Sequence, residues 1–337
     1  MKILAVERGE PGREASWAAG GMLADCPIET PPALWELANT SARMYPEFVG
    51  ALEQASGIKV DLRQHGTILF PENDDLLQQP EFAGRALSPE ALKAMEPHLS
   101  AQGRVALRLT EGSVDPRALT AAAAETARRA GVDFRCGETV TGLDLARGAV
   151  TGVTTTAGRY TAPAVVNCAG AWAGLIRGGQ APTHPVKGQM LCLQTTATNG
   201  LARVVRTPGV YLIPRSNGRL LIGATSENAG FDKQTVPATL ERLHQAALAW
   251  APHLKNCPVV ESWAGLRPGT LDGLPLLGQT DRRGCYIATG HYRDGILLAP
   301  VTARTMADLI CEGRTAHDLS AFSPLRARDW VGRAPSG

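Results

Sequence analysis

The order of its segments is the feature that most constrains how this chain can fold. Up to residue 184, short apolar runs alternate with helical stretches. A β-rich block begins at Pro185 and holds one helix, at 235–250, before a strand, a loop and a helix close the chain. Alternating strands and helices indicate an α/β domain, whereas successive strands indicate an antiparallel sheet. The order therefore predicts an α/β core that carries an inserted antiparallel sheet.

Several segments have clear start and stop signals. Asp115 has the side chain of an N-cap, Pro116 takes the first helical position, and Gly131 ends the helix. Three strand-like runs within 132–156 predict a small meander. The Asn-Gly pair inside Arg215–Gly218 predicts a hairpin turn between two strands.

Other segments carry weaker signals. The run Lys2–Glu7 predicts a buried strand, and 33–56 predicts a helix that Pro46 punctuates. We expect the last helix to span Gly295–Glu312 and the tail after Ser320 to be loosely held.

Composition excludes several classes of function. The chain has 337 residues, enough for two domains, and 34 Lys+Arg against 32 Asp+Glu give a net charge of +2. So small a charge argues against a dedicated nucleic-acid or membrane-surface protein. No apolar run approaches the ~18 residues of a membrane span. The N-terminal MKILAVERGEPG does not resemble a secretory signal, and the seven cysteines form no CxxC. We therefore expect reduced thiols, a cytoplasmic protein and no metal site.

Charged side chains at segment ends are the candidates for ligand binding. Glu7 ends the first strand, where an acidic residue can bind ribose hydroxyls, although a Glu at a strand end is usually only solvated. Arg267 follows a strand, and Arg293 lies in the loop His291–Gly295. Arginine holds a carboxylate through two parallel hydrogen bonds; the alternative for each arginine is an ordinary surface position.

Two helix starts could also bind a ligand. The strand Ala164–Asn167 runs into the small residues of Cys168–Trp172 and then a predicted helix, where a ligand can lie on the helix N-terminus. The helix start at Gly295 could stabilise negative charge on a reduced cofactor, or be an ordinary helix start. The sequence has no motif for nucleophilic catalysis, because no G-x-S-x-G occurs and the histidines are dispersed.

Read together, these residues resemble a known family. The segment Glu7–Ala24 (ERGEPGREASWAAGGMLA) resembles the start of the glycine oxidases, FAD-dependent enzymes of thiazole and thiamine biosynthesis in the D-amino-acid oxidase superfamily. Three more blocks resemble the same family: PVKGQML (185–191), GLRPGTLDGLPLLG (265–278) and YIATGHYRDGILLAP (286–300). The resemblance extends from residue 1 to about residue 315.

The resemblance implies FAD as cofactor and assigns site residues. Glu7 and Arg8 would meet the adenosine, with Val140 near the adenine. The pyrophosphate and flavin would be lined by Ala15, Ser16, Gly20, Gly21 and Met22. The flavin ring would be wrapped by His291, Tyr292, Arg293, Asp294, Gly295, Ile296 and Leu297. Arg267 would hold the substrate carboxylate with Arg293 beside it, and Tyr211 would close over the substrate.

The implied reaction is oxidative deamination of glycine or a similar small amino acid. Hydride would pass from Cα to FAD, an imine would form, and oxygen would be reduced to hydrogen peroxide. For glycine, the imine would supply thiazole synthesis. Sarcosine or D-amino-acid oxidation, or dehydrogenation with another acceptor, stays open. The resemblance also suggests a homotetramer.

The resemblance further implies a Rossmann-like FAD-binding domain with a substrate domain inserted into it. The FAD-binding domain would comprise 1–60, 100–180 and 265–315, the substrate domain 61–99 and 181–264, and the tail 316–337.

The sequence also departs from the family pattern. The strand, G-x-G-x-x-G and helix that open family members are not found, so we expect exposed apolar sheet edges. We expect such a chain to bind FAD weakly or fold poorly unless upstream residues exist. The alternative from another class is a truncated, cofactor-free and inactive remnant. Smaller departures are Asp294, where Asn is common, and Lys187, where Arg is common.

Overall fold

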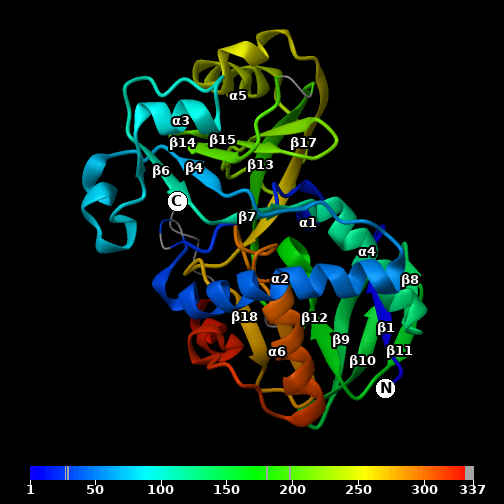
Figure 1. The fold of residues 1–337 in the computed structure, drawn as a ribbon. Coiled ribbons are helices and arrows are strands. Elements are labelled where there is room, and N and C mark those ends of the chain that lie inside the picture. Colours follow the sequence, from blue (N-terminus) through cyan, green and yellow to red (C-terminus); the bar gives the residue numbers. More distant parts are fainter. Residues whose placement is uncertain (27, 29, 180, 197–198, 331–337) are drawn as a thin grey trace.

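The chain folds into two lobes, one built on a large sheet that is antiparallel except where β14 pairs in parallel with β4, and one on smaller sheets and long helices (Figure 1). The computed structural model describes residues 1–330 apart from 27, 29, 180, 197 and 198. None of the helices within these residues is long and apolar enough to cross a membrane.

The first lobe is an eight-stranded sheet. Its strands, in spatial order, are β17 (Val259–Gly269), β13 (His184–Gln194), β16 (Arg219–Gly223), β15 (Val210–Pro214), β14 (Val204–Thr207), β4 (Thr67–Leu69), β6 (Ala106–Leu109) and β5 (Ala86–Leu87). Helix α5 (Pro237–Trp250) packs on the sheet through Leu243 and Trp250, and α3 (Pro89–Met95) adds Leu92 to the same core. The inserted antiparallel sheet is confirmed.

The second lobe holds four smaller sheets and three long helices. The sheets are β1 (Leu4–Glu7) with β8 (Asp133–Cys136); β9 (Val140–Ala146) with β10 (Ala149–Thr155) and β11 (Arg159–Thr161); β12 (Val165–Asn167) with β19 (Cys285–Thr289) and β18 (Leu276–Gln279); and β2 (Met22–Leu23) with β7 (Gly112–Val114) and β3 (Leu62–Arg63). The helices are α2 (Trp35–Ser56), α4 (Pro116–Arg129) and α6 (Ala299–Glu312), and the short α1 (Ala15–Ala18) precedes them. Helix α2 contacts both α4 and α6 and builds a common core with them.

Two predicted local signals are confirmed. The side chain of Asp115 accepts hydrogen bonds from the backbone of Arg117 and Ala118, so it caps α4. Residues Arg215–Gly218 join β15 to β16 as a hairpin. Both signals depend on nearby residues only, which is why they could be identified without tertiary information.

The expected apolar edges are present in the second lobe. Strand β1 pairs only with β8, and β12 pairs only with β19 among the described residues. Leu4 and Val166 are 38% and 37% exposed on these two strands.

The predicted meander over 132–156 is wrong in its first strand. β8 pairs in parallel with β1 instead of joining β9 and β10. Helix α4 immediately precedes β8, and a crossover helix returns the chain parallel to an earlier strand. The meander is formed by β9, β10 and β11.

Pro46 does not interrupt its helix, contrary to the prediction. It lies inside α2 on the exposed face, where water can bond the carbonyl that loses its partner. The opposite face of α2 is buried against α4 and α6, and this packing outweighs the cost of proline.

Two predicted helix starts are also corrected. The segment after β12 is a six-residue 3₁₀ helix, η4 (Gly170–Leu175), and not an α-helix. Helix α6 begins at Ala299 and not at Gly295, because Pro300 sets the first turn and the four residues before Ala299 form a turn.

Residues 320–330 are not loosely held, contrary to the prediction. Two short helices, η6 (Ser320–Phe322) and η7 (Pro324–Trp330), pack on the protein, and Phe322 is 2% exposed. Arg326 donates hydrogen bonds to Asp272 at 2.8 Å and 3.2 Å. These long-range contacts have no local signature; residues 331–337 lie outside the described part of the chain.

Candidate functional site

Arg267 is a cation that the fold holds in place in the region between the lobes. It lies on β17, and its Nη1 donates to the carbonyl of Thr225 at 3.0 Å. Its guanidinium covers Gly188 of β13, where a Cβ would be only 2.5 Å from Nη1. Arg267 is half-buried and has no carboxylate partner among the described residues. A held cation without a counter-ion is suited to bind a carboxylate.

The loop that follows β19 meets the same region through Tyr292. The backbone N–H of Tyr292 donates to the carbonyl of Pro268 at 3.1 Å, and its hydroxyl lies 3.5 Å from that of Ser226. Burial raises the pKa of Tyr292, but Ser226 and the charges of Arg293 and Arg267 outweigh burial and hold this pKa below its ordinary value. Arg267 and loop 291–297 therefore share one site.

Arg293 is more exposed than Arg267. It is exposed, and its guanidinium lies 5.4 Å from the centre of the Tyr292 ring. Asp294 turns the chain toward α6, because its N–H donates to the carbonyl of His291 and its carbonyl accepts from Leu298.

His291 is neutral at physiological pH. Its Nε2 lies 3.1 Å from the hydroxyl of Thr302, and burial lowers its pKa to about 4. The far end of the loop is anchored by the hydroxyl of Tyr45, which donates to the carbonyl of Ile296. His291 to Ile296 nevertheless keep partial exposure, which leaves a surface that a planar ring can cover.

The loop Trp17–Gly20 is held by side chains from three other elements. Trp263 of β17 donates to the carbonyl of Ala18 at 3.0 Å. Arg117 of α4 donates to the carbonyl of Trp17 at 3.2 Å, and Arg215 donates to that of Gly20 at 2.5 Å. Every one of these side chains is distant in sequence from the loop, so its geometry depends on both lobes.

Glycines let the backbone of this loop approach its neighbours. A Cβ at Gly265 would lie 2.3 Å from the Cβ of Ala18. Gly21 has a φ of +75°, and a Cβ there would lie 2.1 Å from the carbonyl oxygen of Val114. A Cβ at Gly20 would be 3.5 Å from the ring of Tyr211, so Tyr211 lies beside this loop, and its closure over a substrate stays a prediction.

Of the other predicted residues, Ala15 and Ser16 lie on α1 and Met22 on β2, while Glu7, Arg8 and Val140 lie at or near the end of β1. One carboxylate oxygen of Glu7 accepts from the backbone of Gly9 at 2.9 Å. Arg8 lies 4.0 Å from the centre of the Trp172 ring and pairs with Glu14. Val140 opens β9 close by, because the N–H of Glu138 donates to the carbonyl of Glu7.

The chemistry of these residues fits two parts of FAD. The second carboxylate oxygen of Glu7 has no partner among the described residues, and an acceptor at the end of a strand suits a ribose hydroxyl. The partly exposed loop 291–296 with its neutral histidine suits the flavin ring. No G-x-G-x-x-G occurs in residues 1–337, so the pyrophosphate has no such loop there.

Sequence reasoning missed the residues that position the site. Trp263, Arg117 and Arg215 hold the loop, and Gly188 and Thr225 hold Arg267. Only Gly188 had a signal, since it lies in the family-like block PVKGQML. The other contacts join strands and helices far apart in sequence, which no local pattern reveals.

Comparison with known proteins agrees with this geometry. The family model described as FAD dependent oxidoreductase (DAO) matches residues 1–309. Glycine oxidase of Pseudomonas putida is 33% identical over 96% of this chain and 92% of its own length. The bifunctional protein ThiO/ThiG of Synechocystis is 35% identical over 93% of this chain and 48% of its own length.

Solved structures show the same relationship. The crystal structure of glycine oxidase from Geobacillus kaustophilus superposes with a TM-score of 0.91 and 34% identity, covering 96% of this chain and 92% of that one. The match includes both lobes, as the coverage requires. On sequence and structure alike, the chain belongs to the DAO family of FAD-dependent oxidoreductases.

Proposed function

We propose that this protein oxidises glycine and similar small amino acids to their imines, using oxygen as acceptor and releasing hydrogen peroxide. The observation that carries the proposal is Arg267, a half-buried cation held on Thr225 and left without a carboxylate partner among the described residues. Glycine oxidases at 33% and 34% identity support the substrate class.

In this proposal the chain binds and orients the substrate. Arg267 holds the carboxylate through charge-assisted hydrogen bonds, and Tyr292 closes one side of the same space. Tyr211 lies beside Gly20 and bounds the other side. The chemistry that bound FAD supplies is acceptance of a hydride from the substrate's Cα and its delivery to oxygen.

The neutral state of His291 also matters for this chemistry. Since its pKa is lowered to about 4, His291 carries no charge at neutral pH. It therefore adds no second cation to compete with Arg267 for the carboxylate. Its Nε2 is held on Thr302, so the imidazole keeps a fixed orientation in the loop.

A biosynthetic role and an assembly state complete the proposal. The ThiO/ThiG relative supports a role in thiazole and thiamine biosynthesis. The cytoplasmic location rests on the cysteine pattern alone. The resemblance to glycine oxidases favours a homotetramer, which light scattering coupled to gel filtration would test directly.

The test uses protein loaded with FAD. We expect peroxide release and anaerobic bleaching of the flavin with glycine, sarcosine, D-alanine or D-proline, and none with methylamine, which lacks the carboxylate. The order of the four substrates distinguishes glycine oxidation from sarcosine or D-amino-acid oxidation. Bleaching without peroxide in air would indicate a dehydrogenase with another acceptor.

Replacing Arg267 tests its role. Arg267→Gln is expected to lower kcat/KM for glycine by about 10–100-fold, since a charge-assisted hydrogen bond contributes ~1.5–3 kcal/mol. Arg129→Gln removes an exposed arginine of α4 paired with Glu125 and serves as the matched control. Unchanged turnover in Arg267→Gln would refute the proposal.

A further inference from the structure

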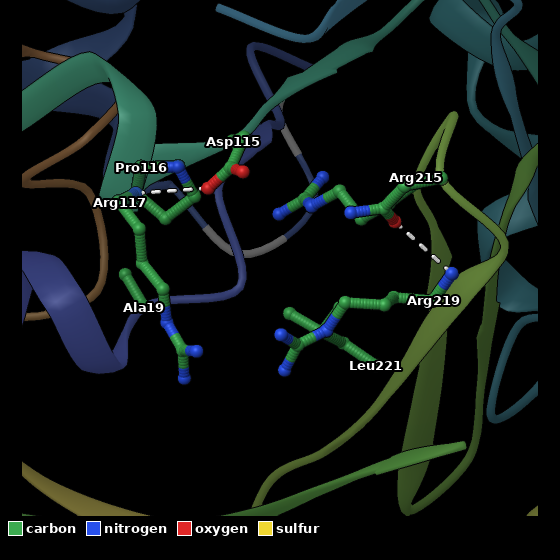
Figure 2. Close-up of a pocket in the computed structure, with 8 residues that line it drawn as sticks. Ala19, Asp115, Pro116, Arg117, Arg215, Arg219 and Leu221 are labelled. Carbon is green, nitrogen blue, oxygen red and sulfur yellow. Dashed lines mark hydrogen bonds between the residues drawn. The ribbon is translucent and has the colours of Figure 1, made fainter. Parts of the chain in front are cut away.

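A second pocket lies between the loop Trp17–Gly20, the start of α4 and the β15–β16 hairpin (Figure 2). It encloses about 350 Å³ of free space, its open mouth included. Its lining residues are Ala19, Asp115, Pro116, Arg117, Arg215, Asn217, Arg219 and Leu221. We propose that this pocket is a binding site for a small oxyanion, a carboxylate or a phosphate.

Arg215 is the residue that points to a ligand. It is only 6% exposed, yet among the described residues its Nη1 has no hydrogen-bond partner and its Nη2 bonds only the carbonyl of Gly20. Burial lowers its pKa to about 10, so it stays charged at neutral pH. A buried guanidinium with an unused donor is costly, and a bound oxyanion would offset that cost.

The carboxylates near Arg215 are already engaged. Asp115 accepts from the backbone of Arg117 and Ala118 at the start of α4. Asp61 accepts from the backbone and the hydroxyl of Ser216. Neither carboxylate forms a salt bridge with Arg215 in the described part of the chain.

The other two arginines share one carboxylate. Arg117 bonds Glu261 at 2.9 Å and 3.0 Å, and Arg219 bonds the same group. Figure 2 shows the side chains of Arg117, Arg215 and Arg219 reaching into one space from α4 and from the hairpin. Within the lining the three arginines face one carboxylate, Asp115, while Asp61, Glu261 and Arg63 act from outside it.

Guanidinium chemistry defines the ligand class. The planar fork of arginine matches the paired oxygens of a carboxylate or phosphate, and it gains little from a spherical ion. Exposed Asn217 lies in the lining, so the pocket is open to solvent there. The free space suits a small ligand, such as inorganic phosphate or a short carboxylate.

A ligand in this pocket would affect the loop Trp17–Gly20, because two of the lining arginines bond to it. Arg215 and Arg117 each bond a carbonyl of that loop. The guanidinium of Arg117 also lies 3.6 Å from the centre of the Trp17 ring and 4.7 Å from that of Trp263. Tryptophan fluorescence therefore gives a readout of binding that is independent of enzyme activity.

The experiment titrates FAD-loaded protein with inorganic phosphate, acetate and chloride at constant ionic strength. Binding is followed by calorimetry and tryptophan fluorescence. We expect a saturable site for phosphate, for acetate or for both that persists in Arg267→Gln, where the proposed substrate site is weakened, and no such site for chloride. Phosphate alone would identify a phosphate site, and acetate alone a carboxylate site. No saturable oxyanion binding, or equal binding of chloride, would overturn the proposal.

Two variants locate the site. Asn217→Asp keeps the side-chain oxygen that accepts from the backbone of Arg219 but adds a negative charge at the mouth. Arg219→Gln removes one cation from the lining. Each is expected to weaken binding about tenfold or more, whereas Arg129→Gln, on the exposed surface of α4, leaves it unchanged. Oxyanion binding that neither pocket variant weakens would place the ligand elsewhere and refute the assignment.

Discussion

The guanidinium of Arg267 occupies the space that a side chain at Gly188 would fill. The two residues are diagonal neighbours on paired strands, because Gly188 of β13 pairs with Gly265 and Val186 pairs with Arg267. A Cβ at Gly188 would lie 2.5 Å to 2.8 Å from three atoms of the guanidinium. The absence of a side chain at one residue therefore sets the position of the other.

Gly188→Ala is expected to displace Arg267 without unfolding the protein. The clash is with the end of a flexible side chain, so the arginine moves and the strands stay paired. We expect kcat/KM for glycine to fall by about tenfold, since a small misplacement of a binding group is costly to catalysis. The free energy of unfolding, measured with urea, is expected to change by less than ~1 kcal/mol.

Gly50→Ala is the control for this variant. Gly50 lies inside α2, and a Cβ there would meet no atom within 4 Å. The substitution is expected to leave catalysis unchanged and to stabilise the helix by ~0.5–1 kcal/mol. If Gly188→Ala behaved like Gly50→Ala, the positioning role of Gly188 would be wrong.

Gly265→Ala is expected to disturb the loop Trp17–Gly20, which we propose to lie against FAD. A Cβ there would lie 2.3 Å from the Cβ of Ala18, and neither atom can swing away because each is fixed to its backbone. We expect a loss of about 1–3 kcal/mol in unfolding free energy and weaker retention of FAD on gel filtration.

The double variant Gly265→Ala with Ala18→Gly tests this contact directly. It moves the methyl group from one side of the contact to the other and removes the overlap. Stability and FAD retention are expected to recover most of the loss, a coupling that a double-mutant cycle measures. Additive losses would show that the two residues act independently.

The parts of this fold that could be predicted are those set by neighbouring residues. The cap at Asp115 and the turn at Arg215–Gly218 were found because their signals lie within a few positions. The sequence could not predict the pairing of β8 with β1 or the packing of Phe322, since both depend on contacts between distant segments.

The candidate site divides in the same way. Arg267 could be identified from its Gly-Pro surroundings and from the family resemblance. The groups that hold it, Thr225 and Gly188, become neighbours only when three strands pair. The sequence shows where the glycines are. Only the fold shows which neighbouring side chain occupies the space that each glycine leaves free.

Glu261→Gln is expected to destabilise the interface of α4 with β17. The carboxylate is bonded by both Arg117 and Arg219, and its loss leaves two half-buried cations without their partner. We expect the unfolding free energy to fall by about 1–3 kcal/mol. Glu125→Gln, which removes an exposed partner of Arg129, is expected to cost less than ~0.5 kcal/mol.

The pH dependence of the Glu261 contribution has a definite sign. Burial raises the pKa of Glu261, but the hydrogen bonds and charges of Arg117 and Arg219 outweigh burial and hold it below the ordinary value of 4.5. The stabilisation is therefore present above pH 4.5 and is lost as the pH falls through the lowered pKa. If the unfolding free energy of wild type and of Glu261→Gln fell equally with acid, this role of the Glu261 carboxylate would be wrong.

His291 is expected to lower the unfolding free energy as the pH falls, in a pH range above the one in which Glu261 acts. Its pKa is 6.5 when unfolded and about 4 when folded, so between these values the unfolded chain binds more protons. Unfolding free energy therefore decreases as the pH falls from 6.5 toward 4, by about 2–3 kcal/mol in all, and is flat with respect to this group above 6.5.

His184 and His253 also have lowered pKa values through burial, so the wild type alone cannot isolate the effect of His291. The difference in unfolding free energy between wild type and His291→Gln isolates it, because the other histidines contribute equally to both proteins. The slope of unfolding free energy against pH is expected to be shallower in His291→Gln, and unchanged in His65→Gln at an exposed position. Equal slopes in all three proteins would mean that the folded and unfolded chains bind the His291 proton equally, so that the fold does not lower the pKa of His291 below 6.5.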